Sequence, residues 1–416
     1  MKVSSISQMR ALDKQAIEDF GITAELLMEN AGHAAYYVLR QEFGICGRRF
    51  IVFCGTGNNG GDGCVLARKI HADGGWVKVF ILGDPAQFKG AARLNFEIIT
   101  RLPVEIQQVA LTQEFQNEIE SCDLIVDAIF GTGLSRDVGG LYQEIIEIIN
   151  RSEKSVLSID IPSGVHGNNG KIMGVAVKAD YTVTFGLPKF GNLLFPGFEL
   201  GGKLFVSHIS FPPSIYNSND LKVGINDLLD FPEIENIDVD GNLLRYGDNS
   251  TNLKDLPPFH EKSKQQDFLI LDVNELARFS GKSAQLVGID QLEALQNTAE
   301  QIKKAIILKG IRPLIGFPDR SVYINLCGSV NEDDEIIWDS LGTTISVMLN
   351  LGFPIRQAIR QGVFIHFLAR DLAVEKHRGS QLTNWDFLHD LPRVVKMLQE
   401  DLDTRLINRY TGIQVV

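Results

Sequence analysis

The first half of the chain alternates between apolar runs and amphipathic stretches. Residues 1–20 and 24–43 place apolar side chains near helical spacing, which predicts two successive helices. Continuous apolar runs follow, and amphipathic segments such as LYQEIIEIINRS lie between them. The predicted strands are RRFIVFCG, WVKVFILG, CDLIVDAIFG, SVLSIDIPSG and ADYTVTFG. Strands that are apolar throughout are typical of a parallel sheet covered by helices on both faces, so the pattern predicts an α/β sandwich.

The pattern changes near residue 216. Residues 217–265 are polar and show little periodicity, which indicates a domain boundary. Beyond them, DFLILDVNELARFSG, AIILKG and SVYINLCG predict further strands, and long amphipathic helices follow. We therefore predict two α/β domains, residues 1–216 and residues 217–416.

Composition narrows the class of function. The 416 residues are 44% hydrophobic and 22% charged, with a formal net charge of -12. Negative charge disfavours nucleic acid and anionic membranes as partners, although local backbone N–H groups can still bind one nucleotide. The five cysteines lack metal-ligand or CxxC spacing, which is typical of free thiols in a reducing compartment. No signal-peptide pattern and no apolar span of roughly 20 residues is present, so we expect a cytoplasmic protein.

Three predicted strands end in the same chemistry, an acid close to glycine. Asp62 lies in GTGNNGGDG, Asp127 in VDAIFGTGLSRD and Asp160 in SIDIPSG. The carboxyl ends of parallel strands share one edge of a sheet, and ligands of open α/β sheets bind there. Glycine at such ends permits close approach of the backbone and positive φ. The three loops are therefore predicted to form one functional site.

Other interpretations of these residues remain open. The run GTGNNG fits G-x-G-x-x-G, whose usual ligand is a dinucleotide pyrophosphate at a helix N-terminus. Asp62 would put a negative charge beside that pyrophosphate, which makes a plain NAD-dependent oxidoreductase the least favoured function. Asp127 and Asp160 could instead cap helices or turns. The oxygen-bearing side chains of Asn59, Asp127 and Ser163 would also suit a hard cation.

Five motifs occur in order along residues 27–189: LMENAG, GTGNNGGDG, VDAIFGTGLSRD, SIDIPSG and TFGLPK. Together they resemble the NAD(P)H-hydrate epimerase family, and the resemblance covers almost all of residues 1–215. It implies a Rossmann-like three-layer α/β/α sandwich and no redox cofactor. It also implies the substrates NADHX and NADPHX, the hydrated forms of NADH and NADPH. The enzyme would interconvert their R and S epimers at C6 of the nicotinamide ring.

The resemblance also implies roles for individual residues. Asn59, Asp127 and Ser163 would bind one potassium ion. The residues implied to contact the substrate are Asn58, Asn59, Gly60, Gly61, Asp62, Gly131, Thr132, Gly133, Leu134, Ser135, Arg136, Asp137 and Asp160.

The chemistry of the hydrate suits a carboxyl group. The ring nitrogen can expel the C6 hydroxyl once an acid protonates it, and water can then return to either face. Asp160 is the first candidate for this catalytic role and Asp62 the second. Backbone N–H groups of the glycine-rich loops can hold the phosphates. Lys189 either assists with phosphate or only caps the last strand.

The second half resembles a shortened dehydratase domain of ribokinase-like fold. In this family such a domain removes water from the S epimer with ADP or ATP. LPPFHEKS, DVNELARFSGKS and GVFIHFLARDLA resemble parts of it. Asp272 stands where the resemblance expects a histidine, and Lys309 and His366 match its pattern.

The anion hole of that domain is altered in this sequence. Ile336, Ile337 and Trp338 replace its glycines, although Asp339 matches the catalytic acid. Residues 263–267 leave no room for the glycine-rich strands that the resemblance expects. An anion hole needs accessible backbone N–H groups, so we predict an inactive dehydratase in which Lys309 and His366 are structural.

Three functions therefore compete for the whole chain. The favoured one is an epimerase with an inactive second domain, whose repair pathway would need a separate dehydratase. A bifunctional epimerase and dehydratase is the first alternative. A non-catalytic binding or scaffold protein is the second, and the intact acidic loops disfavour it. The sequence does not determine the oligomeric state, and a homo-oligomer is compatible with it.

Overall fold

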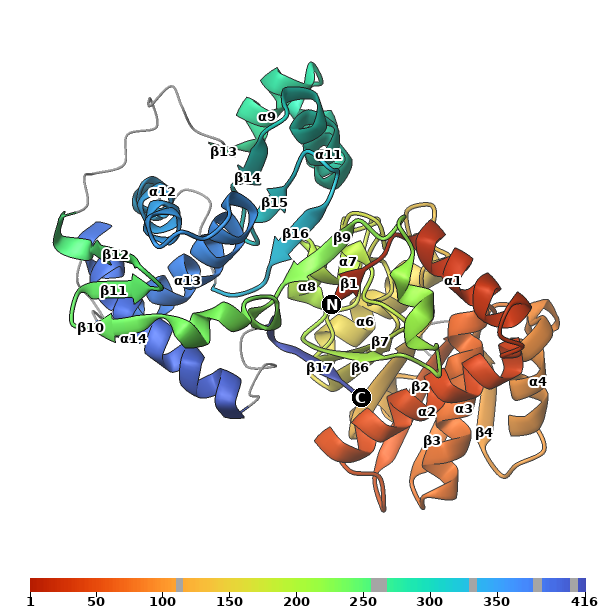
Figure 1. Cartoon of the computed structure of the whole chain (residues 1–416). Coiled ribbons are helices and arrows are strands. Elements are labelled where there is room, and N and C mark those ends of the chain that lie inside the picture. The colour runs from red at the N-terminus through yellow and green to blue at the C-terminus, as the bar shows by residue number, and fades with distance from the viewer. Residues whose placement is uncertain (110–114, 256–267, 329–334, 377–383, 405–410) are drawn as a thin grey trace. The chain divides into compact units, whose positions relative to one another are not determined.

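The computed structural model describes residues 1–109, 115–255, 268–328, 335–376, 384–404 and 411–416 (Figure 1). The chain divides into two compact units. The first unit comprises Lys2–Leu221 with Ile413–Val416, and the second comprises Met1 with Lys222–Gly412. The last strand of the chain therefore belongs to the first unit. None of the helices in the described residues is both long enough and apolar enough to cross a membrane.

An eight-stranded sheet forms the centre of the first unit. Its order is β17-β8-β7-β6-β5-β2-β3-β4, and every neighbouring pair is parallel. The strands are β2 (Arg49–Gly55), β3 (Trp76–Leu82), β4 (Glu105–Val109), β5 (Leu124–Ala128), β6 (Ser155–Ile159), β7 (Tyr181–Phe185), β8 (Lys203–Ser207) and β17 (Ile413–Val415). All residues of β5 are buried, as expected for a central strand covered on both faces. The parallel sheet predicted for the first half is confirmed.

Helices cover both faces of this sheet (Figure 1). One apolar core joins the sheet to α1 (Ile6–Glu18), α2 (Ala24–Glu42), α3 (Asn58–Ala72) and α4 (Gly90–Ile99). A second core lies on the other face, against α5 (Gln116–Ser121) and α6 (Leu141–Arg151). Successive residues of a strand point to opposite faces, so β2 contributes to both cores. The short elements β1 (Lys2–Val3), α7 (Phe190–Leu193) and α8 (Gly197–Leu200) complete this unit.

The glycines in the first two turns of α3 serve close packing. A Cβ on Gly60 would stand 1.7 Å from the carbonyl oxygen of Gly55, and one on Gly63 would stand 2.8 Å from Cys54 Sγ. Neither residue has positive φ. Of the two properties that glycine permits, close approach and positive φ, these two residues use close approach. Glycine is needed here because α3 lies directly against the strand from which it emerges.

The second unit is also α/β, with a mixed sheet. Strands β9, β16, β15, β14 and β13 lie side by side in that order, and β15 runs antiparallel to both of its neighbours. They span Val223–Asn226, Val322–Asn325, Leu314–Gly316, Ala305–Leu308 and Phe268–Leu271 respectively. A separate antiparallel sheet contains β10 (Asp238–Asp240), β11 (Leu243–Tyr246) and β12 (Asn249–Asn252). The helices are α9 (Val273–Ser280), α10 (Ala284–Ile289), α11 (Gln291–Ile302), α12 (Glu335–Asn350), α13 (Ile355–Lys376) and α14 (Asn384–Thr404).

Candidate active site

A cavity of about 990 Å³ opens in the first unit, at the carboxyl ends of β2, β5 and β6. Most of the residues predicted to contact substrate line it, namely Asn58, Asn59, Asp62, Gly131, Thr132, Gly133, Leu134, Ser135, Arg136 and Asp160. Gly60, Gly61 and Asp137 are not among its lining residues. Three loops that are far apart in sequence thus meet at one cavity, because parallel strands end at the same edge of the sheet.

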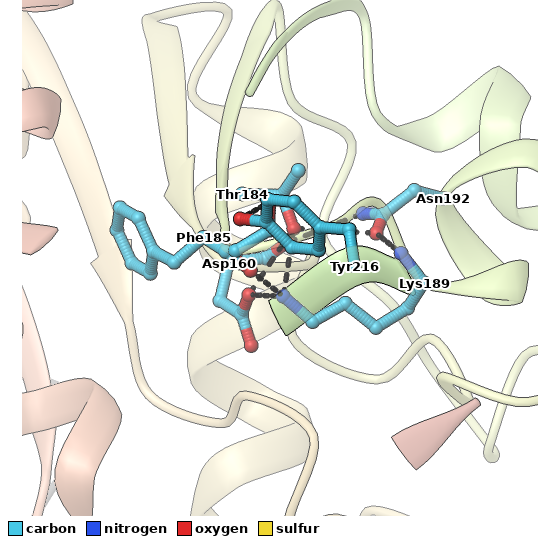
Figure 2. Close-up of polar contacts among 7 residues, drawn as sticks. Asp160, Thr184, Phe185, Lys189, Asn192 and Tyr216 are labelled. Atoms are coloured by element: carbon cyan, nitrogen blue, oxygen red, sulfur yellow. Dashed lines mark hydrogen bonds and ion pairs between the residues drawn. The ribbon is translucent and has the colours of Figure 1, made fainter. Parts of the chain in front are cut away.

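Asp160 and Lys189 form a buried ion pair beside this cavity (Figure 2). The Lys189 ammonium donates to Asp160 Oδ1, to Thr184 Oγ1 at 3.0 Å and to the carbonyl oxygen of Phe185 at 2.9 Å. These three acceptors use all three N–H groups of the ammonium. Lys189 is 1% exposed, so it holds Asp160 in place rather than reaching for a phosphate.

The two carboxylate oxygens of Asp160 differ in their hydrogen bonds. Oδ1 also accepts from Thr184 Oγ1 at 3.2 Å, whereas Oδ2 accepts no hydrogen bond from the residues that the structure describes. A Cβ on Gly131 would stand 3.4 Å from this Oδ2, which places the oxygen beside the second loop. One oxygen of Asp160 is therefore fixed by the protein, and the other is available to a ligand.

The backbone at Asp160 is strained. Its φ is 69°, in the left-handed region that residues other than glycine seldom adopt. Asn192 Nδ2 donates to the carbonyl oxygen of Asp160 at 3.2 Å, and the Asp160 N–H donates to Val183 at 2.7 Å. Such outliers persist where the surroundings determine them, and they gather at functional sites.

Asp127 is fully buried, two residues before Ile129, which lines the cavity. Its carboxylate accepts from Ser158 Oγ at 2.7 Å, from both the N–H and the hydroxyl of Ser163, and from the Ile129 N–H at 3.3 Å. Burial raises the pKa of Asp127, and these hydrogen bonds oppose the rise. Asp127 thus ties the end of β5 to the loop that follows β6.

Asn59 brings an amide to the same region. A Cβ on Gly131 would stand 3.1 Å from Asn59 Oδ1, and Asn59 Nδ2 is buried without a hydrogen-bond partner among the described residues. Ser163 Oγ lies 2.8 Å from the Phe130 N–H and 3.1 Å from the Phe130 carbonyl oxygen. Amide, hydroxyl, carbonyl and carboxylate oxygens therefore gather where the first two loops meet the third.

Two further carboxyl groups line the cavity, and sequence reasoning identified only one of them. Burial raises the pKa of Asp62 well above its usual range, and the charges of Asp160 and Asp13 add to this rise. Burial also raises the pKa of Asp13 to about 6, against the lowering effect of Lys189. Asp13 lies on α1, so an argument based on strand ends could not find it.

The rim of the cavity is suited to an anionic ligand. Helix α3 begins after Gly57 without a side-chain cap, and Gly57, Asn58 and Asn59 at its start line the cavity. Arg10, Lys89 and Arg136 line the same cavity. Arg10 and Lys89 were also missed, because they lie outside the three loops.

In the second unit, the described part of the altered motif lies in the first turn of α12. Ile337 and Trp338 are buried in an apolar core, while Asp339 is exposed. His366 is buried between Thr344 Oγ1 and the Ile337 carbonyl oxygen, each 2.9 Å away, and burial lowers its pKa to about 4. The segment LPPFHEKS and residues 263–267 lie outside the described residues.

Asp272 and Lys309 occupy ordinary positions of an α/β unit. Asp272 caps α9, accepting from the Glu275 N–H at 2.7 Å, while Glu275 accepts from the Asp272 N–H at 2.9 Å. This reciprocal pair is a capping box. Lys309 directly follows β14, and its N–H donates to the Leu271 carbonyl oxygen.

Comparison with known proteins connects these observations to a family. The family model described as "YjeF-related protein N-terminus" matches residues 24–191. A bifunctional NAD(P)H-hydrate repair enzyme from Moorella thermoacetica is 26% identical, and the match covers 97% of this chain and 98% of that protein. An NAD(P)H-hydrate epimerase from Levilactobacillus brevis is 36% identical over 50% of this chain and 94% of its own length. A yeast protein of known structure, 24% identical, covers 53% of this chain with a TM-score of 0.42, over 98% of its own length.

The bifunctional NAD(P)H-hydrate repair enzyme of Thermofilum pendens is similar to this chain over its full length. It is 32% identical, and the match covers 99% of both chains. The alignment spans 521 positions against the 416 residues here, so that relative contains segments with no counterpart in this chain. The first unit is thus an NAD(P)H-hydrate epimerase domain, an isomerase, and the chain as a whole belongs to the family of bifunctional NAD(P)H-hydrate repair enzymes.

Proposed function

We propose that the first unit interconverts the R and S epimers of NADHX and NADPHX at the cavity beside Asp160. One observation carries this assignment to specific residues. Asp160 is held by Lys189 through Oδ1 and leaves Oδ2 unpaired, among described residues, in a cavity large enough for a nucleotide. A carboxylate that is rigid yet open to a ligand is suited to proton transfer.

The residues around Asp160 support this chemistry. Loss of the C6 hydroxyl needs a proton on the departing oxygen, and the ring nitrogen supplies the electron pair that expels it. Return of water needs a base at C6, which Asp160 provides through Oδ2. Lys189 is a positioning residue, since its N–H groups are all engaged. Asp62 is the second candidate for proton transfer.

The phosphates of the substrate would bind at the start of α3. The free N–H groups after Gly57 and the positive end of the helix dipole attract an anion. Lys89 and Arg136 add positive charge at the same cavity. A dinucleotide bound in this way would place its nicotinamide ring toward Asp160.

The oxygen atoms of Asn59, Asp127, Phe130 and Ser163, here called the oxygen-rich corner, suit a potassium ion. Ser163 Oγ contacts both Asp127 Oδ1 and the Phe130 carbonyl oxygen, and Asn59 Oδ1 lies beside Gly131 in the same loop as Phe130. These are hard ligands with a single carboxylate charge, which suits a monovalent cation. A bound ion would tie the three loops together. Diffraction from crystals soaked in a heavier monovalent salt should give a peak among Asn59, Asp127 and Ser163, and an empty corner with ordered substrate would exclude the ion.

A direct assay tests the main proposal. The full chain is mixed with R-NADPHX, and the epimer ratio is followed by chromatography with and without an independent dehydratase. Without the dehydratase we expect the ratio to move to equilibrium, and with it we expect the R epimer to be consumed through the S epimer as NADPH appears. An unchanged epimer ratio would refute the assignment.

The second unit has two candidate functions. Two full-length relatives are named bifunctional repair enzymes, which favours an ADP-dependent or ATP-dependent dehydratase in this chain. Loss of that activity is favoured by the buried Ile337 and Trp338 in the first turn of α12 and by the shorter length of the chain. An anion site requires accessible N–H groups, and phosphoryl chemistry depends on such positioning.

One measurement separates these two functions. The protein is given S-NADHX with ATP or ADP, and NADH is followed at about 340 nm, where the reduced cofactor absorbs. Nucleotide-dependent recovery that disappears in an Asp339→Asn variant would establish the bifunctional enzyme. No recovery would establish the loss of dehydratase activity.

A further inference from the structure

Asp13 is a third carboxyl group that lines the active-site cavity, and it has no part in the reaction described above. Helix α1 presents Met9, Arg10, Asp13 and Ile17 to the cavity at helical spacing. The helix is fixed at its start, because the Ile6 N–H donates to Asn168 Oδ1 at 2.8 Å. Asp13 forms no hydrogen bond or ion pair with any residue in the described part of the chain. It is thus a positioned acid without a structural partner.

Epimerisation creates a need for two such groups. The two epimers carry the C6 hydroxyl on opposite faces of the ring. A carboxyl group on one face can protonate the hydroxyl of one epimer, but it cannot reach the hydroxyl of the other. Unless the ring turns over in the site, each face needs its own acid and base.

We propose that Asp13 is the proton-transfer group for one face of the nicotinamide ring and Asp160 the group for the other. This assignment rests on the proposed epimerase function of the cavity. Asp13 comes from α1, whereas Asp160 comes from the end of β6, so the two carboxyls reach the cavity from different elements.

The step balances. In one direction, protonated Asp13 gives its proton to the C6 hydroxyl, the C6–O bond breaks, and water leaves as the ring nitrogen forms a cationic ring. Water then attacks C6 from the other face, a new C6–O bond forms, and Asp160 Oδ2 accepts the released proton. The reverse direction exchanges the two roles. Neither an oxidant nor a cofactor is needed.

Asp62 is less suited to this role than Asp13. Asp62 is 8% exposed, whereas Asp13 is partly exposed and can exchange its proton with solvent between turnovers. The charged groups that Asp13 meets are Asp160, Asp62 and Lys189, and Tyr216 lies in the same electrostatic environment. With a pKa of about 6, Asp13 can both give and take a proton near neutrality.

Oxygen exchange tests the two faces separately. Wild type, Asp13→Asn, Asp160→Asn and Asp62→Asn are incubated with each purified epimer of NADPHX in ¹⁸O-labelled water. Epimer ratio and label are read by chromatography and mass spectrometry, after subtracting an enzyme-free sample. Glu18→Gln is the matched control, because Glu18 is an exposed carboxylate on the same helix, paired with Lys14.

We expect Asp13→Asn to lower epimerisation about 100-fold or more. Label should still enter one epimer with retained configuration, because Asp160 still serves its face, and the other epimer should stay unlabelled. Asp160→Asn should label the opposite epimer. One-sided exchange also proves that the variant site is folded.

Three results would overturn the role of Asp13: epimerisation at the wild-type rate in Asp13→Asn, equal slowing or loss of exchange in both epimers, or one-sided exchange in Asp62→Asn instead. Failure of the underlying epimerase assignment would look different, because the wild type itself would then leave both epimers unchanged.

Discussion

The segment around Asp160 in the first unit and the segment around Trp338 in the second both resemble family motifs, but their surroundings differ. In the first unit, Asp160 leaves a carboxylate oxygen open beside a cavity, and Lys189 is buried to hold it there. In the second unit, Ile337 and Trp338 fill a core, and His366 is used by hydrogen bonds within the fold. Since the Ile337 carbonyl can only accept, His366 Nε2 carries the proton and Nδ1 accepts from Thr344.

The described residues of the two motifs differ in how their polar and apolar groups are arranged. The site of the first unit keeps one carboxylate oxygen unpaired among the described residues and has strained backbone at Asp160, whereas Ile337 and Trp338 fill the volume of a core.

The largest effect is expected at the intact site. Asp160→Asn keeps the shape but removes the base, so the epimerisation rate should fall by about 10²–10⁴-fold. Rates are measured as the change in epimer ratio at fixed enzyme concentration. Asp123→Asn is the control, because Asp123 directly precedes the first residue of β5 and its carboxylate accepts a hydrogen bond only from the Arg49 N–H among the described residues. Full activity in Asp160→Asn would remove the distinction between the two units.

Substitutions of Trp338 test how much the core of the second unit depends on this side chain. Trp338→Ala should lower the free energy of unfolding of the second unit by about 3–5 kcal/mol, because a large buried ring packed on Phe367 is lost. Trp338→Phe should cost far less, since Trp338 Nε1 has no described hydrogen-bond partner. Urea unfolding gives both values. A loss of epimerase activity without unfolding would show that Trp338 acts on the first unit.

Much of the first unit could be predicted from sequence because its strands are continuous apolar runs. Their ends had to meet at one edge, which placed Asp62 and Asp160 at one cavity. Asp13 could not be found in this way, since its position depends on how α1 packs. The ion pair between Lys189 and Asp160 could not be predicted either, because nothing in TFGLPK indicates that Lys189 lies next to the end of β6.

The glycine-rich turn shows a second limit of sequence reasoning. Gly60 and Gly63 serve close packing rather than positive φ, whereas positive φ occurs in the third loop, at Asp160 and Gly164. Asp272, marked as a departure from a catalytic pattern, is a helix cap. In both cases the residue type was informative, but its physical role depended on which backbone lay next to it.

Replacing Asp13 should have a smaller effect, and it should raise rather than lower the free energy of unfolding. Its folded pKa is about 6, above the usual 3.8, so the unfolded chain binds fewer protons in this interval and stability falls as pH rises through it. Asp13→Asn removes this cost and should stabilise the first unit by about 1–2 kcal/mol at pH 8, after allowance for partial exposure. Near pH 4 the gain should vanish. Urea unfolding at both pH values checks this, and a loss of stability at pH 8 would mean that the fold needs the carboxylate.

The smallest expected effect concerns Asp272. Asp272→His restores the residue type that the dehydratase resemblance expects, yet it should destabilise the second unit by about 1 kcal/mol. The reason is local: Asp272 accepts the Glu275 N–H at 2.7 Å, and a negative charge at a helix N-terminus is favourable. A histidine side chain lacks the short carboxylate that closes this capping box. Asp272→Ser should keep most of the stability, because serine caps equally well. Urea unfolding of both variants measures the difference. Equal stability of the histidine and serine variants would show that the cap contributes little, and dehydratase activity gained by Asp272→His would show that the second unit still retains the rest of an active site.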